Sequence, residues 1–191
     1  MFYSICKFFT NIYMKIFFRL KVEGVENIPK DGGLVLCSNH ISNYDPVALA
    51  AAINRRIYFL AKKELFSVKV LGWYLRAVEM IPVDRNKTDM NAFREGLKVL
   101  KNENVLGIFA EGTRNKTGEM GDAKAGVALF ALKGNANVLP VYISGEYKYF
   151  STIRVRIGKA IDLSEFKGVK ADTEILNQAT EKIMVEVRKL K

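Results

Sequence analysis

The 191-residue chain contains a single histidine, His40, and only two cysteines, Cys6 and Cys37. These few nitrogen and sulfur side chains show no metal-binding spacing, which argues against a zinc site. A disulfide framework is not expected either, since Cys6 lies in a very apolar terminal segment, and this usage is typical of a reducing, cytoplasmic compartment. The chain also lacks repeats, low-complexity tracts and an internal linker, so residues 22–191 are expected to form one domain.

No uncharged hydrophobic run reaches the ~18 residues that a membrane-spanning helix needs, because Lys7, Lys15 and Arg19 interrupt the apolar N-terminus. This segment also lacks a basic start and a small-residue cleavage site, so it is a poor signal peptide. On a helix over residues 1–21, the cations would form a narrow stripe on a surface that is otherwise large and apolar. The pattern favours an amphipathic helix in a membrane interface. The alternative is a terminal helix packed on the domain's own core.

Basic residues are in excess: 30 Lys and Arg stand against 20 Asp and Glu, a formal net charge of +10. Such an excess indicates a polyanionic partner, which can be an acidic membrane surface, a phosphate ester or a nucleic acid. No nucleic-acid-binding motif is visible in the chain. Anionic lipid and phosphate-bearing substrates are therefore the expected partners.

His40 is followed five residues later by a carboxylate, Asp45. Five residues on a helix turn by about 500°, which would point the two side chains apart, but a loop would bring them together. The apolar run 34–37 predicts a buried strand before His40, and Asp45-Pro46 predicts a helix start with Asp45 as N-cap. One carboxylate oxygen would then cap the helix while the other orients the imidazole, as in a catalytic dyad. The spacing alone equally allows a loop histidine bonded to a capping aspartate, with no chemistry.

The rest of the chain alternates between strand-like and helix-like segments. Strands are expected over residues 34–37, 57–60, 80–83, 105–110, 138–144 and 153–157, and helices over residues 47–53, 64–77, 88–101, 123–132 and 172–190. This alternation predicts an α/β fold: a single domain with a largely parallel central sheet flanked by helices.

Polar clusters follow three of the predicted strands: His40, Arg85 and the segment 111–114. The carboxyl ends of parallel strands lie along one edge of a sheet, so these clusters are expected to converge there. The guanidinium groups of Arg85 and Arg114 suit a phosphate, because their planar forks match its oxygens. The alternative for each arginine is a solvated charge at a strand end.

Four ordered blocks resemble the signatures of the glycerolipid acyltransferases, in particular the bacterial 1-acyl-sn-glycerol-3-phosphate acyltransferases. The blocks are Asn39-His40 with Asp45, Met80–Arg85, Phe109–Arg114 and Val138–Val141. Lys124-Ala125-Gly126 is similar to the lysine–glycine pair that commonly follows the third block. The resemblance covers residues 22–160, and it departs from the family pattern at Glu79, where glycine is frequent.

The resemblance implies transfer of a fatty acyl group from acyl-CoA or acyl carrier protein to the sn-2 hydroxyl of lysophosphatidic acid, giving phosphatidic acid. It implies that His40 is the general base and Asp45 its orienting partner. Residues with an implied role in substrate binding are Arg85, Glu111, Gly112, Thr113, Arg114 and Lys124. No metal, no cofactor beyond the acyl donor and no acyl-enzyme are implied, so Cys37 is expected to be a small core residue of a buried strand.

A lysophospholipid partitions into the bilayer, so we expect a peripheral or monotopic protein at the cytoplasmic face of the cell membrane. The apolar helix around Trp73 adds a second apolar surface or lines the acyl groove; the alternative is a core helix. Two other functions stay open. One is an acyltransferase for another acceptor, such as glycerol 3-phosphate or a different lysolipid, and the other is a non-catalytic binder of anionic membranes.

Overall fold

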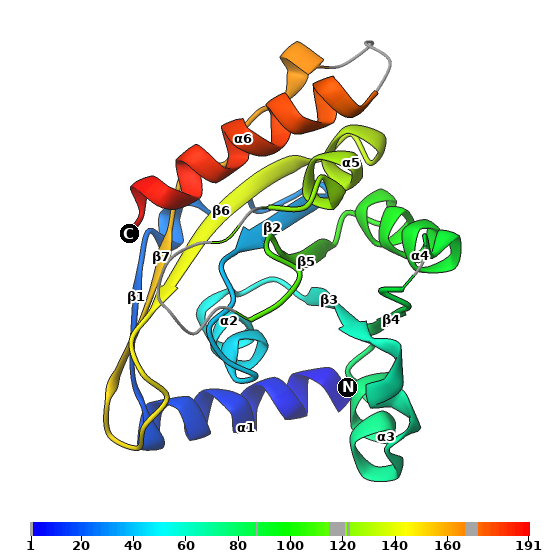
Figure 1. Cartoon of the computed structure of the whole chain (residues 1–191). Helices are drawn as coiled ribbons and strands as arrows, with labels where there is room; N and C mark the ends of the chain where they lie inside the picture. The colour runs from blue at the N-terminus through cyan, green and yellow to red at the C-terminus, as the bar shows by residue number, and fades with distance from the viewer. Residues whose placement is uncertain (1, 87, 115–120, 122, 167–171) are drawn as a thin grey trace.

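The computed structural model describes residues 2–86, 88–114, 121, 123–166 and 172–191 (Figure 1). Within this part of the chain, seven strands form one sheet in the order β1-β7-β6-β2-β5-β3-β4. The strands are β1 (Arg19–Glu23), β2 (Leu34–Ser38), β3 (Ile57–Lys62), β4 (Ile81–Val83), β5 (Val105–Phe109), β6 (Asn137–Ser144) and β7 (Thr152–Ile157). Neighbouring strands are parallel except for the antiparallel β6–β7 pair. The predicted α/β fold with a largely parallel sheet is confirmed.

Helices cover both faces of the sheet (Figure 1). One face is covered by α1 (Phe2–Phe17) and α2 (Asp45–Ala52). The other is covered by α4 (Met90–Lys101), α5 (Gly126–Lys133) and α6 (Thr173–Lys189). A short 3₁₀ helix, η2 (Lys63–Ser67), and α3 (Lys69–Ala77) stand beside β3 and β4. Two further 3₁₀ turns are η1 (Val25–Asn27) and η3 (Ser164–Phe166).

The central strand β2 is buried on both faces. Leu34 and Leu36 pack in the core beneath α1 and α2, whereas Val35 and Cys37 pack in the core beneath α4, α5 and α6. A parallel strand covered on both sides needs such a continuous apolar run. The chain leaves the sheet after Ser38, at the edge where β4 and β5 also end. The loops that follow these strands are therefore brought to one side of the molecule.

The structure corrects two of the predicted elements. The N-terminal helix ends at Phe17, and Arg19, placed above on its cationic stripe, instead begins β1. Alternating exposed and half-buried residues over 19–23 suit an edge strand. The expected helix over residues 64–77 is broken at Val68, whose backbone is extended. The break lets α3 fold back on η2, with Gly72 so close to the Phe66 carbonyl that a Cβ would lie 2.2 Å from its oxygen.

Helix α1 packs on the domain by one side and leaves an apolar side exposed. Met14 is fully buried, and Lys7 turns inward, where its Nζ donates to the Ile53 carbonyl at the end of α2 (2.6 Å). The outward residues are Ile5, Phe8, Phe9, Ile12 and Ile16. Helix α1 thus covers part of the core, as the alternative interpretation expected, and its other side is apolar and exposed. None of the helices in the described part of the chain has the length and apolar character needed to cross a membrane.

Asp89 is the N-cap of α4, which begins at Met90, whereas the sequence predicted a helix from Thr88. One carboxylate oxygen accepts from the backbone N–H groups of Asn91 and Ala92 (3.1 Å each), and the other accepts from that of Asp84 (3.0 Å). These bonds join the segment after β4 to α4. The backbone donors of Asp84 and Ala92 hold the pKa of the Asp89 carboxyl below its ordinary value.

Candidate active site

The loop between β2 and α2 brings His40 and Asp45 together. His40 Nδ1 lies 2.7 Å from Asp45 Oδ2, and the carboxylate is fully buried. Because a carboxylate only accepts hydrogen bonds, Nδ1 is the donor in this contact, and in a neutral ring Nε2 then keeps the lone pair. Since Nδ1 faces the buried Asp45, Nε2 is the ring nitrogen left for the cavity that His40 lines.

Asp45 is held by the loop and does not cap the helix. Its Oδ2 also accepts from the backbone N–H groups of Ile41 (2.7 Å) and Ser42 (2.8 Å), and these charge-assisted bonds offset the burial of a carboxylate. Helix α2 begins at Asp45 itself, and the N-cap position is taken by Tyr44 without a side-chain bond. The predicted N-cap role is therefore wrong, because the donors that satisfy the carboxylate precede the helix.

Asn39 fixes the start of this loop to β6. Its side-chain amide donates to the Ile143 carbonyl (2.9 Å), and its oxygen accepts from the Ile143 N–H (2.7 Å). These two hydrogen bonds extend the pairing of β2 with β6 beyond the end of β2, and Asn39 is buried at this point. Asn39 belongs to the first of the four sequence blocks, but its partner Ile143 is 104 residues away in the chain, and no local pattern in the sequence marks this contact.

Two aromatic rings hold the imidazole. Phe109, the last residue of β5, stacks on the His40 ring with a centroid separation of 3.9 Å and an interplanar angle of 15°. Phe59 of β3 stacks in turn on Phe109 at 5.7 Å. The imidazole therefore has its plane fixed by β5 and its edge fixed by Asp45. Neither ring had a role predicted from the sequence.

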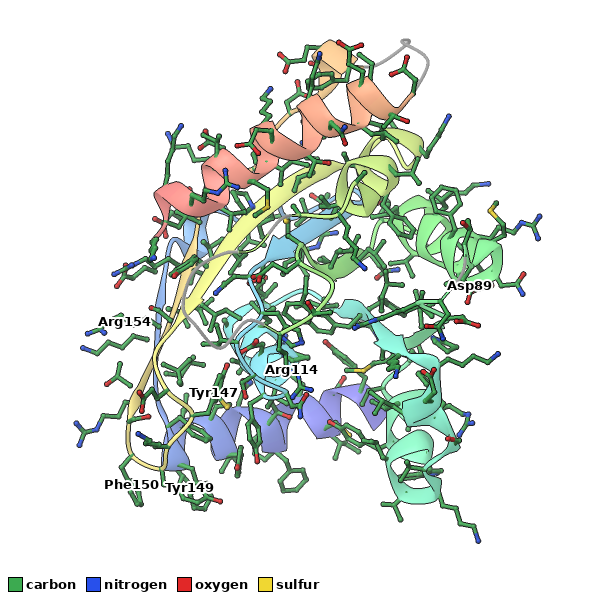
Figure 2. The ribbon with its side chains drawn as sticks, viewed as in Figure 1. Asp89, Arg114, Tyr147, Tyr149, Phe150 and Arg154 are labelled. Carbon is green, nitrogen blue, oxygen red and sulfur yellow. The ribbon has the colours of Figure 1, made fainter. Side chains whose placement is uncertain are left out.

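Tyr147, in the segment between β6 and β7 (labelled in Figure 2), interacts with Asp45. Its hydroxyl and Asp45 Oδ1 are both buried, and neither has a hydrogen bond of good geometry in the described part of the chain. Burial, and after it the Asp45 carboxylate, raise the pKa of Tyr147. The Tyr147 ring stacks on Tyr44 at 5.6 Å. Tyr147 thus lies beside the dyad carboxylate, and no motif in the sequence indicated this contact.

A cavity of about 560 Å³ opens beside His40. Arg85 and Arg114 line it together with His40, and Figure 2 shows Arg114 in the middle of the molecule beside α2. Most of the remaining lining is apolar and comes from α1, α2, β3 and α3, including Val47, Ile57, Phe59, Leu71, Leu75 and Met80. Helix α3 thus lines the cavity with one side, while Trp73 is 60% exposed on another. The imidazole and two guanidinium groups therefore stand at an apolar cavity.

Of the other predicted binding residues, Gly112 contacts Arg85 directly. Its Nη1 donates to the Gly112 carbonyl (2.6 Å), and Gly112 has a left-handed φ of 67° that favours glycine. The Lys124 side chain covers Gly112, such that a Cβ there would lie 3.1 Å from Lys124 Cδ. Thr113 is exposed. The Glu111 carboxylate is buried and accepts from the Gly121 N–H (3.2 Å), so its contact is with the following loop.

Glu79, the departure from the family pattern, has a left-handed φ of 58°. Glycine adopts this conformation without strain, which accounts for its frequency at this position in the resembling family. The Glu79 carboxylate pairs with Arg56 at 2.9 Å on a partly exposed surface. The substitution is therefore accommodated at the end of α3, and the carboxylate is engaged by Arg56.

Cys37 is a core residue, as predicted. It lies in β2 with no exposed surface, and burial raises the pKa of its thiol to about 12. At neutral pH it is a protonated thiol without access to a substrate, so it is no candidate nucleophile.

The sequence and the fold both have counterparts in known proteins. The sequence model of the acyltransferase family matches residues 19–144, and the chain belongs to this family. It is 30% identical to a 1-acyl-sn-glycerol-3-phosphate acyltransferase of Bacillus subtilis, over 92% of this chain and 94% of that protein. It is 29% identical to the chloroplastic 1-acyl-sn-glycerol-3-phosphate acyltransferase LPAT1 of Arabidopsis thaliana, over 94% of this chain and 52% of the relative.

A solved structure is similar over almost the whole chain. The crystal structure of the 1-acyl-sn-glycerophosphate acyltransferase PlsC from Thermotoga maritima matches with a TM-score of 0.78 and 26% sequence identity. The match covers 98% of this chain and 78% of that one. The predicted family and the prediction that the protein is an acyltransferase are confirmed.

Proposed function

We propose that this protein transfers a fatty acyl group from acyl-CoA or acyl carrier protein to the sn-2 hydroxyl of 1-acyl-sn-glycerol 3-phosphate. The product is phosphatidic acid, and the pathway is phospholipid biosynthesis. The observation that carries the proposal is the 2.7 Å contact of His40 with Asp45 at an apolar cavity that two arginines share. The relatives from Bacillus subtilis and Thermotoga maritima bear the name of this activity.

His40 acts as the general base. Its Nε2 takes the proton of the acceptor hydroxyl as that oxygen attacks the thioester carbonyl, and the Asp45 carboxylate stabilises the imidazolium that forms. The tetrahedral intermediate then expels the thiolate, which takes the proton from the imidazolium and leaves as a thiol. The proton and the acyl group are thus both transferred without a covalent enzyme intermediate, a metal or a cofactor.

The acceptor phosphate is bound by Arg85 and Arg114, whose guanidinium groups line the cavity with His40. Arg85 donates one hydrogen bond to the Gly112 carbonyl, and its remaining N–H groups donate to the ligand phosphate. Lys124, which covers Gly112, adds a cation nearby. Glu111 and Thr113 shape this loop, and the apolar part of the cavity receives an acyl chain.

The protein acts at the cytoplasmic face of the cell membrane, where its lysolipid substrate resides. The apolar outward side of α1, which is part of the N-terminal segment 1–21, supports this placement ahead of an acyltransferase domain over residues 22–191. Helices with one wide apolar side bind in the interface, and a basic protein is further attracted to anionic lipid. The acyl donor and the anionic bilayer are the partners in this scheme.

The test is thiol release from acyl-CoA and acyl carrier protein with three acceptors: lysophosphatidic acid, glycerol 3-phosphate and a lysolipid without a phosphomonoester. His40→Asn, whose side-chain amide keeps an N–H near the position of Nδ1 for Asp45, and His40→Ala should both lose turnover while thermal unfolding stays cooperative. Turnover near that of wild type in either variant would reject His40 as the base. Preference for another acceptor would replace the substrate, and vesicle binding without any thiol release would indicate a non-catalytic membrane protein.

A further inference from the structure

The tip of the β6–β7 hairpin presents two aromatic side chains to solvent. Tyr149 is 66% exposed and Phe150 is 67% exposed (Figure 2). Phe150 also has a left-handed φ of 65°, a conformation that bulky residues rarely adopt. Exposure and backbone strain each disfavour phenylalanine here, and glycine or asparagine would remove both. Strain retained at an exposed position calls for a functional explanation.

This tip is continuous with the end of α1. The Phe150 N–H donates to the Phe17 carbonyl (2.7 Å), and the Tyr149 ring lies 5.5 Å from that of Phe17 and 6.1 Å from that of Phe18. In Figure 1 the hairpin descends to the level of α1 at the end that is away from the N-terminus. The aromatic tip therefore extends the outward apolar side of α1 into a second, separate element.

Basic side chains lie near the tip and along the strands behind it. The exposed ones are Lys15, Arg19, Lys21, Lys148 and Arg154, and Figure 2 shows Arg154 higher up the strands than Tyr149 and Phe150. Lys21 and Arg154 are partners in the parallel β1–β7 register, so two like charges stand on neighbouring strands, which is an unfavourable arrangement. The nearby carboxylates do not pair with Lys21 or Arg154: Glu23 pairs with Arg156, and Glu146 pairs with Lys148. Among the described residues, Arg19, Lys21 and Arg154 make no ion pair within 4 Å.

We propose that the β6–β7 hairpin is a second membrane anchor, which inserts Tyr149 and Phe150 among the head groups of an anionic bilayer while Arg19, Lys21 and Arg154 contact lipid phosphates. The proposal deepens the membrane placement made above. Aromatic rings at the tip with cations behind them match the interface of an acidic bilayer, in which rings lie at head-group depth and cations face anionic lipid. The other side of α1 lines the cavity, so docking by α1 and the hairpin together holds the cavity at the bilayer surface.

Phe150→Gly gives the sharpest test, because a structural role and a membrane role predict opposite results. Glycine relieves the left-handed strain, so the thermal midpoint should stay the same or rise. Loss of the ring that inserts into the bilayer should weaken binding to vesicles of phosphatidylcholine and phosphatidylglycerol by about tenfold. The matched control is Asn135→Gly, which changes another exposed left-handed residue far from the hairpin and should bind like wild type. Binding of Phe150→Gly equal to that of the control would overturn the proposal.

Arg154→Gln tests the charged part of the same anchor. Its binding to the mixed vesicles should fall, and the difference from wild type should vanish with pure phosphatidylcholine or at high salt. An Arg154→Gln variant that loses binding equally to neutral and anionic vesicles would contradict a contact with lipid phosphates. Turnover of a short-chain, water-soluble acceptor should be unchanged in both hairpin variants. Vesicle binding of the hairpin variants therefore tests the membrane anchor. Turnover of His40→Ala tests the catalytic proposal separately.

Discussion

Asp45→Asn separates the charge of the dyad carboxylate from its geometry. Asp45 Oδ2 accepts three hydrogen bonds, from His40 Nδ1 and from the backbone of Ile41 and Ser42. An asparagine oxygen can accept the same three bonds in the same buried volume, and its NH₂ group then replaces Oδ1 beside Tyr147. The loop should therefore keep its conformation, while the imidazolium that forms during proton transfer loses its counter-charge.

The expected effect on turnover is large and the effect on stability is small. General base catalysis contributes about 10²- to 10⁴-fold, and loss of the charge that supports the base should lower kcat by about that factor, or about 3 to 5 kcal/mol of transition-state stabilisation. Each of the three hydrogen bonds weakens by about 1 kcal/mol when its acceptor becomes neutral. Removal of a fully buried charge offsets part of this loss, so the free energy of unfolding should change by no more than about 2 kcal/mol.

Thiol release with acyl-CoA and lysophosphatidic acid, paired with thermal unfolding, measures both quantities. Because the two residues act as a unit, the double variant Asp45→Asn/His40→Ala should be no slower than His40→Ala. Asp45→Ala is the contrasting control: it leaves three donors without an acceptor, at about 1 to 3 kcal/mol each, and should be strongly destabilised. A folded Asp45→Asn protein that turns over at nearly the wild-type rate would refute the dyad, and a change in KM alone would make the carboxylate a binding group.

Four further outcomes are expected. Arg114→Ala should raise KM for lysophosphatidic acid about tenfold or more through loss of a charge-assisted phosphate contact, with little change for the acyl donor; equal effects on both substrates would contradict a phosphate role. Tyr147→Phe should lower kcat without changing the acyl-donor KM, and Tyr149→Phe is its control in the same hairpin. Cys37→Ala should remain active, and the native Cys37 thiol should resist thiol reagents at pH 8; labelling there would contradict its burial. Asp89→Ala should lower the thermal midpoint at pH 7. Since the folded-state pKa of Asp89 is lowered, its contribution is present above about pH 3.9 and is lost as pH falls through the lowered pKa, so the two proteins should converge in acid.

The sequence predicted the elements that periodicity and chemistry mark locally. The apolar run of β2, the turn-rich loop and Asp45-Pro46 together gave the His40–Asp45 pairing, and the strand-end positions of Arg85 and Arg114 gave their convergence at one cavity. The N-cap role of Asp45 was wrong because α2 begins at Asp45 itself, and the sequence pattern does not fix the first helical residue that closely. Strand β1 was missed because its short alternation follows directly on a long aromatic helix.

The supports of the dyad could not be predicted, because each depends on a contact between distant parts of the chain. Phe109 reaches the imidazole only because β5 lies beside β2, and Asn39 meets Ile143 only because β6 lies on the other side. Strand order is not encoded in any window of the sequence. The left-handed backbone of Glu79 was likewise invisible, although the family's glycine at that position indicated that the backbone there is unusual.

One short stretch after β6 joins the catalytic loop to the proposed membrane surface. Ile143 holds Asn39, Tyr147 lies against Asp45, and Tyr149 and Phe150 form the exposed tip, all within eight residues of the chain. The Phe150 N–H bond to α1 fixes this stretch at its outer end, and the Asn39 amide fixes it at its inner end. The β2–α2 loop supplies the hydrogen bonds that hold the dyad carboxylate, and the hairpin adds Tyr147 beside that carboxylate. The same hairpin therefore connects the surroundings of the dyad with the end of α1.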